Sequence, residues 1–163
     1  MLGGAEMELV QDIEEIVAQK EIGTLTFLRI SFYDHRFKEV EQTKIIHEIL
    51  RMVFRLKNEE PSSYSVLKNE DSLLVTLNLQ DECLVNLAFA SWDEPQVPVF
   101  KIELVGKNGM IQYDSQADNA FSGTYTSSPI KINGKKVSAE LEQYIIDLVE
   151  EIQQVQQREV KVG

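Results

Sequence analysis

The side chains of this sequence that could do chemistry are few. Tyr33, Asp34, His35 and Arg36 stand in one polar run, and His47 lies within the apolar segment that follows. An imidazole can transfer a proton near neutral pH or bind a metal ion, and an arginine can hold an anionic group. The two histidines lack the His-x-x-x-His spacing that favours a zinc site. The residue types alone leave the role of these side chains open, and a plain charged turn is one interpretation of the polar run.

Nucleophilic catalysis has little support in the sequence. Cys83 is the only cysteine, so neither an internal disulfide nor a cysteine-based metal cluster can form. It lies in an alternating apolar run, and no Gly-x-Ser-x-Gly turn is present. We interpret Cys83 as a small apolar strand residue and the low cysteine content as typical of a reducing compartment.

Length, charge and hydropathy narrow the class of protein. With 163 residues and 43% hydrophobic side chains, we expect a single domain over residues 1–163. The 16 Lys+Arg against 27 Asp+Glu give a net charge of -11, which repels phosphate backbones and anionic lipids. No apolar run has the length of a membrane span. The sequence thus predicts a cytoplasmic protein that binds neither nucleic acid nor membrane.

Three segments have the period of amphipathic helices and would position the polar residues. The first runs from Glu8 to Gln19 and stops before the Ile22-Gly23 pair, and the second runs from Glu41 to Leu56. The third begins after Ser138, a good N-cap residue, and continues to about Gln156. His47 lies on the second helix, at the border of its apolar face.

Between the helices the pattern changes to the alternation of β-strands. The predicted strands are Thr24 to Tyr33, Ser63 to Lys68, Ser72 to Leu79, Cys83 to Ala90 and the two arms of a hairpin around Gly106-Lys107-Asn108-Gly109. A second small hairpin over 130–137 and an edge strand over 158–162 complete the prediction. We expect an α+β fold, in which an open, mainly antiparallel sheet of about six strands has helices packed on one face.

The other face of such a sheet stays open, and its composition is mixed. Polar side chains predicted there are Thr76, Asn78, Asn86, Lys101 and Glu103, and apolar ones are Ala88, Val99 and Val105. A surface of this kind suits the interface of a homodimer.

Several motifs, taken together, resemble the C-terminal domain of the Gfo/Idh/MocA family of NAD(P)-dependent oxidoreductases. Gln19 to Ser31 contains an Ile-Gly pair between a helix and a strand, and Val105 to Gly109 has the family's Val-Gly-x-x-Gly turn. The helix from Glu140 and the final Arg158 to Val162 are similar to its closing helix and strand. The resemblance covers roughly residues 12 to 163. It implies a domain whose open sheet covers an active site and packs subunits together.

The resemblance also implies a partner domain. In the family an N-terminal Rossmann domain binds NAD(P), but this sequence has no Gly-x-Gly-x-x-Gly loop between a strand and a helix. The Glu-Lys-Pro motif that carries the family's catalytic lysine is absent as well. We therefore expect residues 1–163 to bind no cofactor, and NAD or NADP to bind only where a Rossmann domain precedes them.

One catalytic position can be carried over from the family. Members place an Asp and a His four residues apart on the helix that corresponds to Gln42 to Leu56, and His47 matches the histidine. Thr43 stands where the Asp is expected, and a threonine cannot supply the carboxylate that orients an imidazole. A catalytic role for His47 is one prediction, and packing at the edge of the apolar face is the other.

Three functions follow from these observations. The first is the substrate-side and oligomerisation domain of an NAD(P)-dependent oxidoreductase acting on a sugar, polyol or related compound, inactive alone, with Tyr33, His35 and Arg36 as substrate-binding residues. The second is a stand-alone dimerising or ligand-binding module that has lost the chemistry, which Thr43 favours. The third is an independent enzyme that uses His47 and His35.

Overall fold

The computed structural model describes residues 22–35, 37, 42–92, 98–116, 125–126, 137–155 and 160–162. Two predicted elements fall outside this part of the chain. They are the helix from Glu8 to Gln19 and nearly all of the small hairpin over 130–137.

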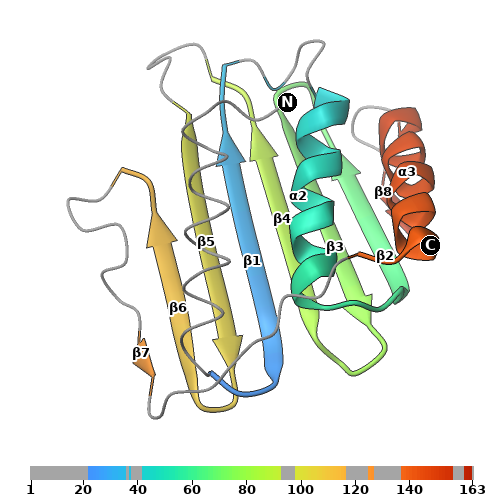
Figure 1. Ribbon diagram of the computed structural model, residues 1–163. Coiled ribbons are helices and arrows are strands. Elements are labelled where there is room, and N and C mark those ends of the chain that lie inside the picture. The colour runs from blue at the N-terminus through green and yellow to red at the C-terminus, as the bar shows by residue number, and fades with distance from the viewer. Residues whose placement is uncertain are drawn as a thin grey trace.

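Eight strands form one mixed sheet in the order β7-β6-β5-β1-β4-β3-β2-β8 (Figure 1). The strands are β1 (Leu25–Tyr33), β2 (Pro61–Lys68), β3 (Ser72–Leu79), β4 (Leu84–Ala90), β5 (Val99–Gly106), β6 (Gly109–Asp114), β7 (Tyr125–Thr126) and β8 (Val160–Val162). Six of them are long, and β7 and β8 add two and three residues at the edges. The predicted open, mainly antiparallel sheet of about six strands is confirmed.

One pair departs from the antiparallel pattern for a topological reason. The chain leaves the central strand β1 through a helix and returns at β2, and the meander β2-β3-β4 then leads back to β1. The crossover through α2 makes β2 run in the same direction as β1. Two chain reversals then separate β2 from β4, so β4 also runs parallel to β1. The remaining pairs in the described sheet are antiparallel.

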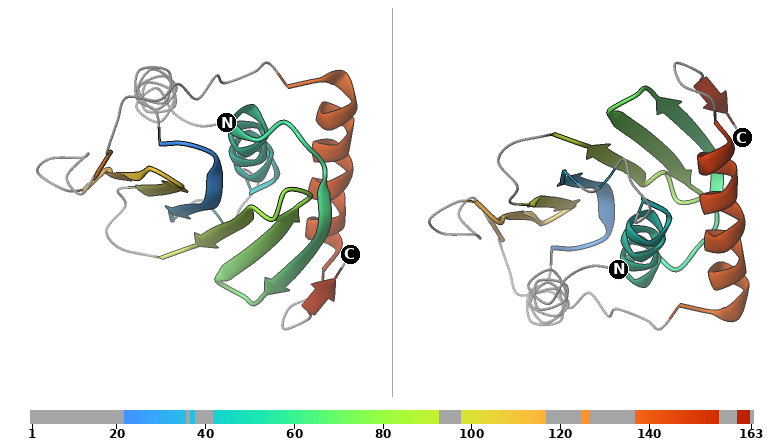
Figure 2. Two further views of the ribbon diagram at one scale, coloured as in Figure 1. Left: turned by 90° about the horizontal axis from the view of Figure 1, so that it is seen from below. Right: turned by 90° about the horizontal axis from the view of Figure 1, so that it is seen from above.

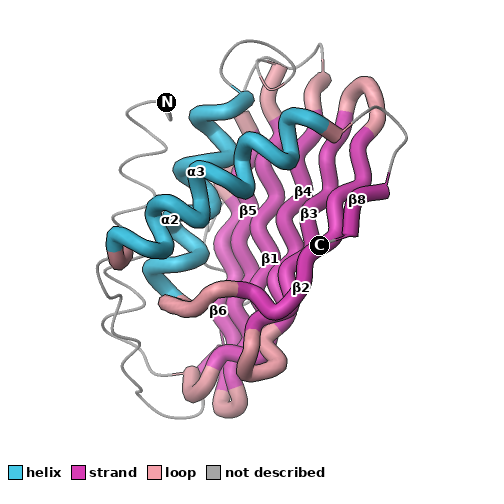
Figure 3. Tube along the Cα trace, turned by 90° about the vertical axis from the view of Figure 1, so that its right-hand side faces the viewer, coloured by secondary structure: helices cyan, strands magenta, loops and turns pink. Residues whose placement is uncertain are grey.

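Two described helices, α2 (Gln42–Leu56) and α3 (Ala139–Gln154), cover the same face of the sheet (Figures 2 and 3). The start of α3 is the predicted one, because the Ser138 hydroxyl accepts a hydrogen bond from the backbone N–H of Leu141 at 3.2 Å. The helices also contact each other, with the rings of Phe54 and Tyr144 edge to face at 6.0 Å. The prediction that helices pack on one face holds for both.

The two faces of the sheet differ sharply in polarity. On the helix side, the row Ile102, Ile30, Leu87, Val75 and Val66 crosses five strands, and each of these side chains is at most 2% exposed. The next row, on the open side, consists of Glu103, Arg29, Asn86, Thr76 and Ser65. The strands therefore bury one face by alternation and present polar groups on the other.

The two glycine motifs that carry the family resemblance lie against each other. The backbone N–H of Asn108, in the β5–β6 turn, donates to the carbonyl oxygen of Ile22 at 2.9 Å. Gly23 has a φ of +81°, which glycine adopts without strain. A Cβ at Gly106 would lie 2.0 Å from the Ile22 carbonyl oxygen, so only glycine allows this approach. Together the two motifs hold the start of β1 against the β5–β6 hairpin.

Candidate functional site

His47 lies at the junction of α2 and α3. Its imidazole is about one quarter exposed, and its Nε2 is 3.7 Å from Oε1 of Glu142 on α3. The guanidinium of Arg51, one helical turn further along α2, forms an ion pair and a hydrogen bond with the same carboxylate oxygen. Two side chains of one helix thus hold one carboxylate of the other.

A shallow groove of about 280 Å³ lies beside this junction. It is lined by Thr43, Lys44, His47, Glu48, Ile146, Val149 and Glu150. The exposed Thr43 has no carboxylate to offer the imidazole, as the sequence indicated. Both the packing of His47 at the edge of the apolar face and its catalytic role remain predictions.

The polar run at the end of β1 is divided between different surroundings. Tyr33 packs against Trp92, with ring centroids 5.7 Å apart. The Nδ1 atom of His35 lies 2.9 Å from Oδ1 of Asp34, whose side chain is fully buried. Arg36 lies outside the described residues. His47 is on the helix side of the sheet and Tyr33 faces the open side, so these two predicted site residues do not share a site.

The open face carries a pocket of about 450 Å³ over β1, β5 and β6. The side chains of this charged pocket are Arg29, Ser31, Tyr33, Lys101, Glu103, Gln112 and Asp114, with Ile102 and Tyr113 also contributing to the lining. Tyr33 is the one member that the sequence had marked as a site residue. Alternation within β1 places Arg29 and Ser31 on the open face, but which strands lie beside them depends on the pairing register.

The charges of this pocket are of both signs. Lys101 Nζ is 3.8 Å from Asp114 Oδ2, which makes a loose surface ion pair. Arg29 and Glu103 are directly opposite in the β1–β5 register. Arg29 donates from Nε to the Asn86 side-chain oxygen at 3.4 Å, a long hydrogen bond. Two cations and two carboxylates balance each other, so the pocket is neutral within a strongly acidic chain.

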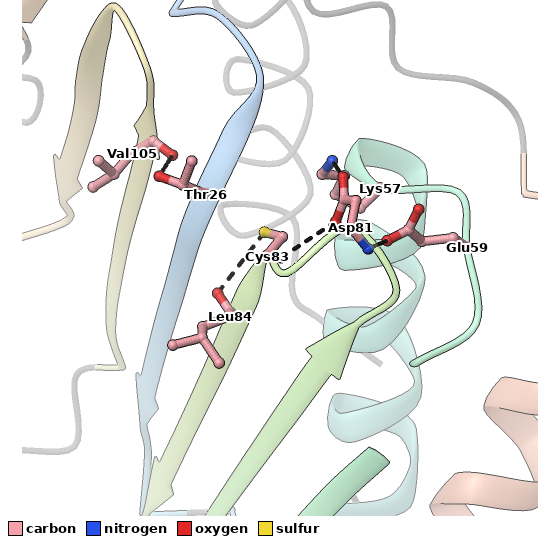
Figure 4. Close-up of polar contacts among 7 residues, drawn as sticks. All are labelled: Thr26, Lys57, Glu59, Asp81, Cys83, Leu84 and Val105. Carbon is pink, nitrogen blue, oxygen red and sulfur yellow. Dashed lines mark hydrogen bonds and ion pairs between the residues drawn. The ribbon is translucent and has the colours of Figure 1, made fainter. Parts of the chain in front are cut away.

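The surroundings of Cys83 give it no role in catalysis (Figure 4). Its side chain is fully buried, and burial raises the pKa of the thiol to about 11, so the thiolate is scarce at neutral pH. Nearby, the Asp81 carboxylate accepts a hydrogen bond from Lys57, and the Asp81 backbone N–H donates to Glu59 at 3.3 Å. These contacts fix the β3–β4 turn. In the described part of the chain no three His, Cys, Asp or Glu side chains gather to hold a metal ion.

Comparison with known proteins yields matches of structure but not of sequence. No protein-family model matches the chain, and no curated protein sequence does. A Thermotoga maritima structure assigned as an oxidoreductase matches with a TM-score of 0.62 at 10% identity, over 96% of this chain and 59% of its own. The UDP-N-acetylglucosamine 3-dehydrogenase GnnA of Acidithiobacillus ferrooxidans matches with a TM-score of 0.58 at 11% identity, over 87% and 55%.

A third match is an oxidoreductase of Bacillus cereus, with a TM-score of 0.55 at 11% identity, over 94% of this chain and 67% of its own. The chain therefore spans little more than half the length of the first proteins it resembles. Separately, none of the described helices is long and apolar enough to cross a membrane. At these identities the matches establish the fold, and the chain has the fold of the C-terminal domain of the Gfo/Idh/MocA-type dehydrogenases.

Proposed function

We propose that the chain is a single cytoplasmic domain that serves as the substrate-side and oligomerisation part of an NAD(P)-dependent oxidoreductase, and that it has no activity alone. The observation that supports this function is the structural match, which takes in nearly the whole chain but just over half of the dehydrogenase structures. One of those proteins is named for a sugar-nucleotide substrate. This favours a sugar, polyol or related compound as the substrate class.

The connection from β1 to α2 lacks the glycine-rich sequence that binds the pyrophosphate of NAD(P). Pyrophosphates bind where a glycine-rich turn leads from a strand into the N-terminus of a helix. Here β1 leads into α2 through residues 34–41, and none of these residues is glycine. The cofactor would have to be held by another domain.

The reading frame that encodes the chain tests this proposal. A Rossmann-encoding segment directly upstream in the same frame would support it, and a stop codon there would contradict it. A second measurement is a titration of NADH fluorescence with the chain, for which we expect no saturable change. Saturable binding of NADH by residues 1–163 would also overturn the proposal.

The oligomerisation part of the proposal rests on exposed leucines of the open face. Leu67 and Leu74, the leucine patch, are 48% and 37% exposed, and Leu84, elsewhere on the open face, is 45% exposed. Leu67 and Leu74 form a cross-strand pair on β2 and β3, and Leu84 lies on β4. Burying such side chains against a second copy removes apolar surface from water, at roughly 25 cal/mol per Å².

Sedimentation velocity of a Leu74→Lys variant checks this interface. A lysine beside Leu67 should shift the chain from dimer to monomer, because a charge would have to be buried without a partner. The matched control is Ile146→Lys on α3, where an isoleucine is 41% exposed away from the open face. A dimer that survives Leu74→Lys but not Ile146→Lys would place the interface on the helices.

The second candidate is a stand-alone dimerising or ligand-binding module that has kept the fold and lost the chemistry. It is favoured by Thr43 at the position of the carboxylate and by the contact of His47 with Glu142 at 3.7 Å. The reading-frame test separates the two candidates. Under either of them, the chain shows no turnover of a sugar or polyol; turnover that disappears in His47→Ala would instead establish the independent enzyme.

A further inference from the structure

Arg29 and Glu103 form an open pair of opposite charges in the charged pocket. The two residues are cross-strand partners on β1 and β5, yet no ion pair joins them. In the part of the chain that the structure describes, the Glu103 carboxylate has neither a hydrogen bond nor an ion pair. Arg29 makes its long contact with Asn86 through Nε, and among the described residues the two terminal nitrogens of its guanidinium have no hydrogen-bond partner.

The neighbouring pair of opposite charges in the same pocket, Lys101 and Asp114, forms an ion pair. Lys101 and Asp114 are also cross-strand partners, on β5 and β6, and their charged atoms are 3.8 Å apart. The two pairs thus stand in successive rows of the open face, and only Lys101 and Asp114 form an ion pair. The open pair is where a ligand can supply the missing partners.

The arrangement of charges restricts the ligand to one class. An anion would be attracted by Arg29 but repelled by Glu103 and by the net charge of -11. A cation would be attracted by Glu103 but repelled by Arg29. A neutral compound would leave both charges without a counter-charge. A zwitterion satisfies both, since a carboxylate can accept two hydrogen bonds from a guanidinium while an ammonium donates to a carboxylate.

The pocket also has room and a wall for the rest of such a ligand. Its volume of about 450 Å³ lies in the range of small-molecule sites, roughly 300–1,000 Å³. At one end the Tyr33 ring is held by Trp92, and beside it Ser31 is 7% exposed.

We propose that the charged pocket binds a small zwitterion of the free α-amino acid class, with the ligand carboxylate on Arg29 and its ammonium on Glu103. The site lies on the open face over β1, β5 and β6, whereas the leucine patch lies over β2 and β3, and the helices that carry His47 are on the opposite face. It does not depend on the proposed oxidoreductase role. The amino-acid side chain would extend toward Tyr33.

Calorimetric titration with matched ligands tests the charge requirement. The probes are glycine and L-phenylalanine as zwitterions, L-phenylalaninamide as a cation, N-acetyl-L-phenylalanine as an anion and N-acetyl-L-phenylalaninamide as a neutral form. We expect saturable binding of at least one zwitterion and affinities lower by about tenfold or more for the three capped forms, each of which lacks a charge-assisted contact. Equal binding of all four phenylalanine compounds, or binding of neither zwitterion, would overturn the proposal.

Variants of the full chain locate the site. Arg29→Gln and Glu103→Gln should each weaken zwitterion binding by about tenfold or more while leaving the urea midpoint nearly unchanged, because both residues are on the surface. Lys107→Gln and Glu140→Gln remove one exposed cation and one exposed carboxylate elsewhere and should leave binding unchanged. Zwitterion binding that survives both pocket variants contradicts the assignment. Binding should also persist in Leu74→Lys, so that failure of the dimer and failure of this site are told apart.

Discussion

The helix junction and the charged pocket use the same kinds of side chain in opposite ways. At the junction, His47 and Arg51 converge on the single carboxylate of Glu142, so the polar groups hold one helix to another. In the pocket, Arg29 and Glu103 stand side by side on neighbouring strands without meeting. Charged groups that satisfy each other are structural, whereas charged groups that remain open are available to a ligand. The comparison therefore moves attention from the histidine to the open face.

The largest expected effect comes from disturbing the turn that aligns the pocket strands. In Gly106→Ala the new Cβ would lie 2.0 Å from the carbonyl oxygen of Ile22, which is backbone and cannot rotate away. We expect the free energy of unfolding to fall by roughly 2–3 kcal/mol, as for other overpacked sites, and zwitterion binding to weaken because the β1–β5 register is disturbed. Urea unfolding measures the first effect and calorimetry the second.

The control for this change is Lys107→Ala in the same turn, where the side chain is exposed. It should alter the free energy of unfolding by no more than about 0.5 kcal/mol. If Gly106→Ala were as mild as this control, the close approach of the hairpin to Ile22 would not be what fixes the pocket strands.

The sequence was sufficient to predict the fold class and most of its helices and strands, because the signals for these are local. Alternation defined the long strands, the 3.6-residue period defined α2 and α3, and Ser138 marked the start of α3. The two glycine motifs indicated the family resemblance, although the direct contact between Gly106 and Ile22 that explains them appears only in the structure. Edge strand β8 was also predicted, from a short terminal segment.

The charged pocket could not be predicted because it depends on pairing between distant segments. Alternation places Arg29 on the open face, and it places Glu103 there as well, but nothing local makes β1 and β5 neighbours. The parallel pairing of β1 with β4 was not predicted either, because these strands are far apart in the sequence and are brought together by the crossover. His47 could be singled out from the sequence because histidine is a reactive residue type. Its contact with Glu142 could not be predicted, because it depends on how α3 packs against α2.

A medium effect is expected where the helix junction depends on the start of α3. The Ser138 hydroxyl accepts the hydrogen bond of the Leu141 N–H, and its removal in Ser138→Ala should cost about 1 kcal/mol of the free energy of unfolding. Ser138→Asp, which keeps an acceptor, should restore most of this loss. Zwitterion binding should stay unchanged in both variants, since the pocket lies on the other face. A loss of binding in Ser138→Ala would mean that the two regions are coupled.

The smallest expected effect tests whether the junction is structural and nothing more. Arg51 and Glu142 are 42% and 32% exposed, so their ion pair belongs to the surface class worth about 0.2–1 kcal/mol, and Glu142→Gln should destabilise the chain by that amount. Glu140→Gln is the matched control, because both glutamates lie in the first turn of α3 and interact with its dipole. Their difference, measured by urea unfolding, isolates the contacts with Arg51 and His47, and it should shrink in high salt. A difference in the free energy of unfolding well above 2 kcal/mol that salt does not reduce would show a desolvated charge cluster. Such a result would contradict the assignment of the junction as an ordinary surface contact.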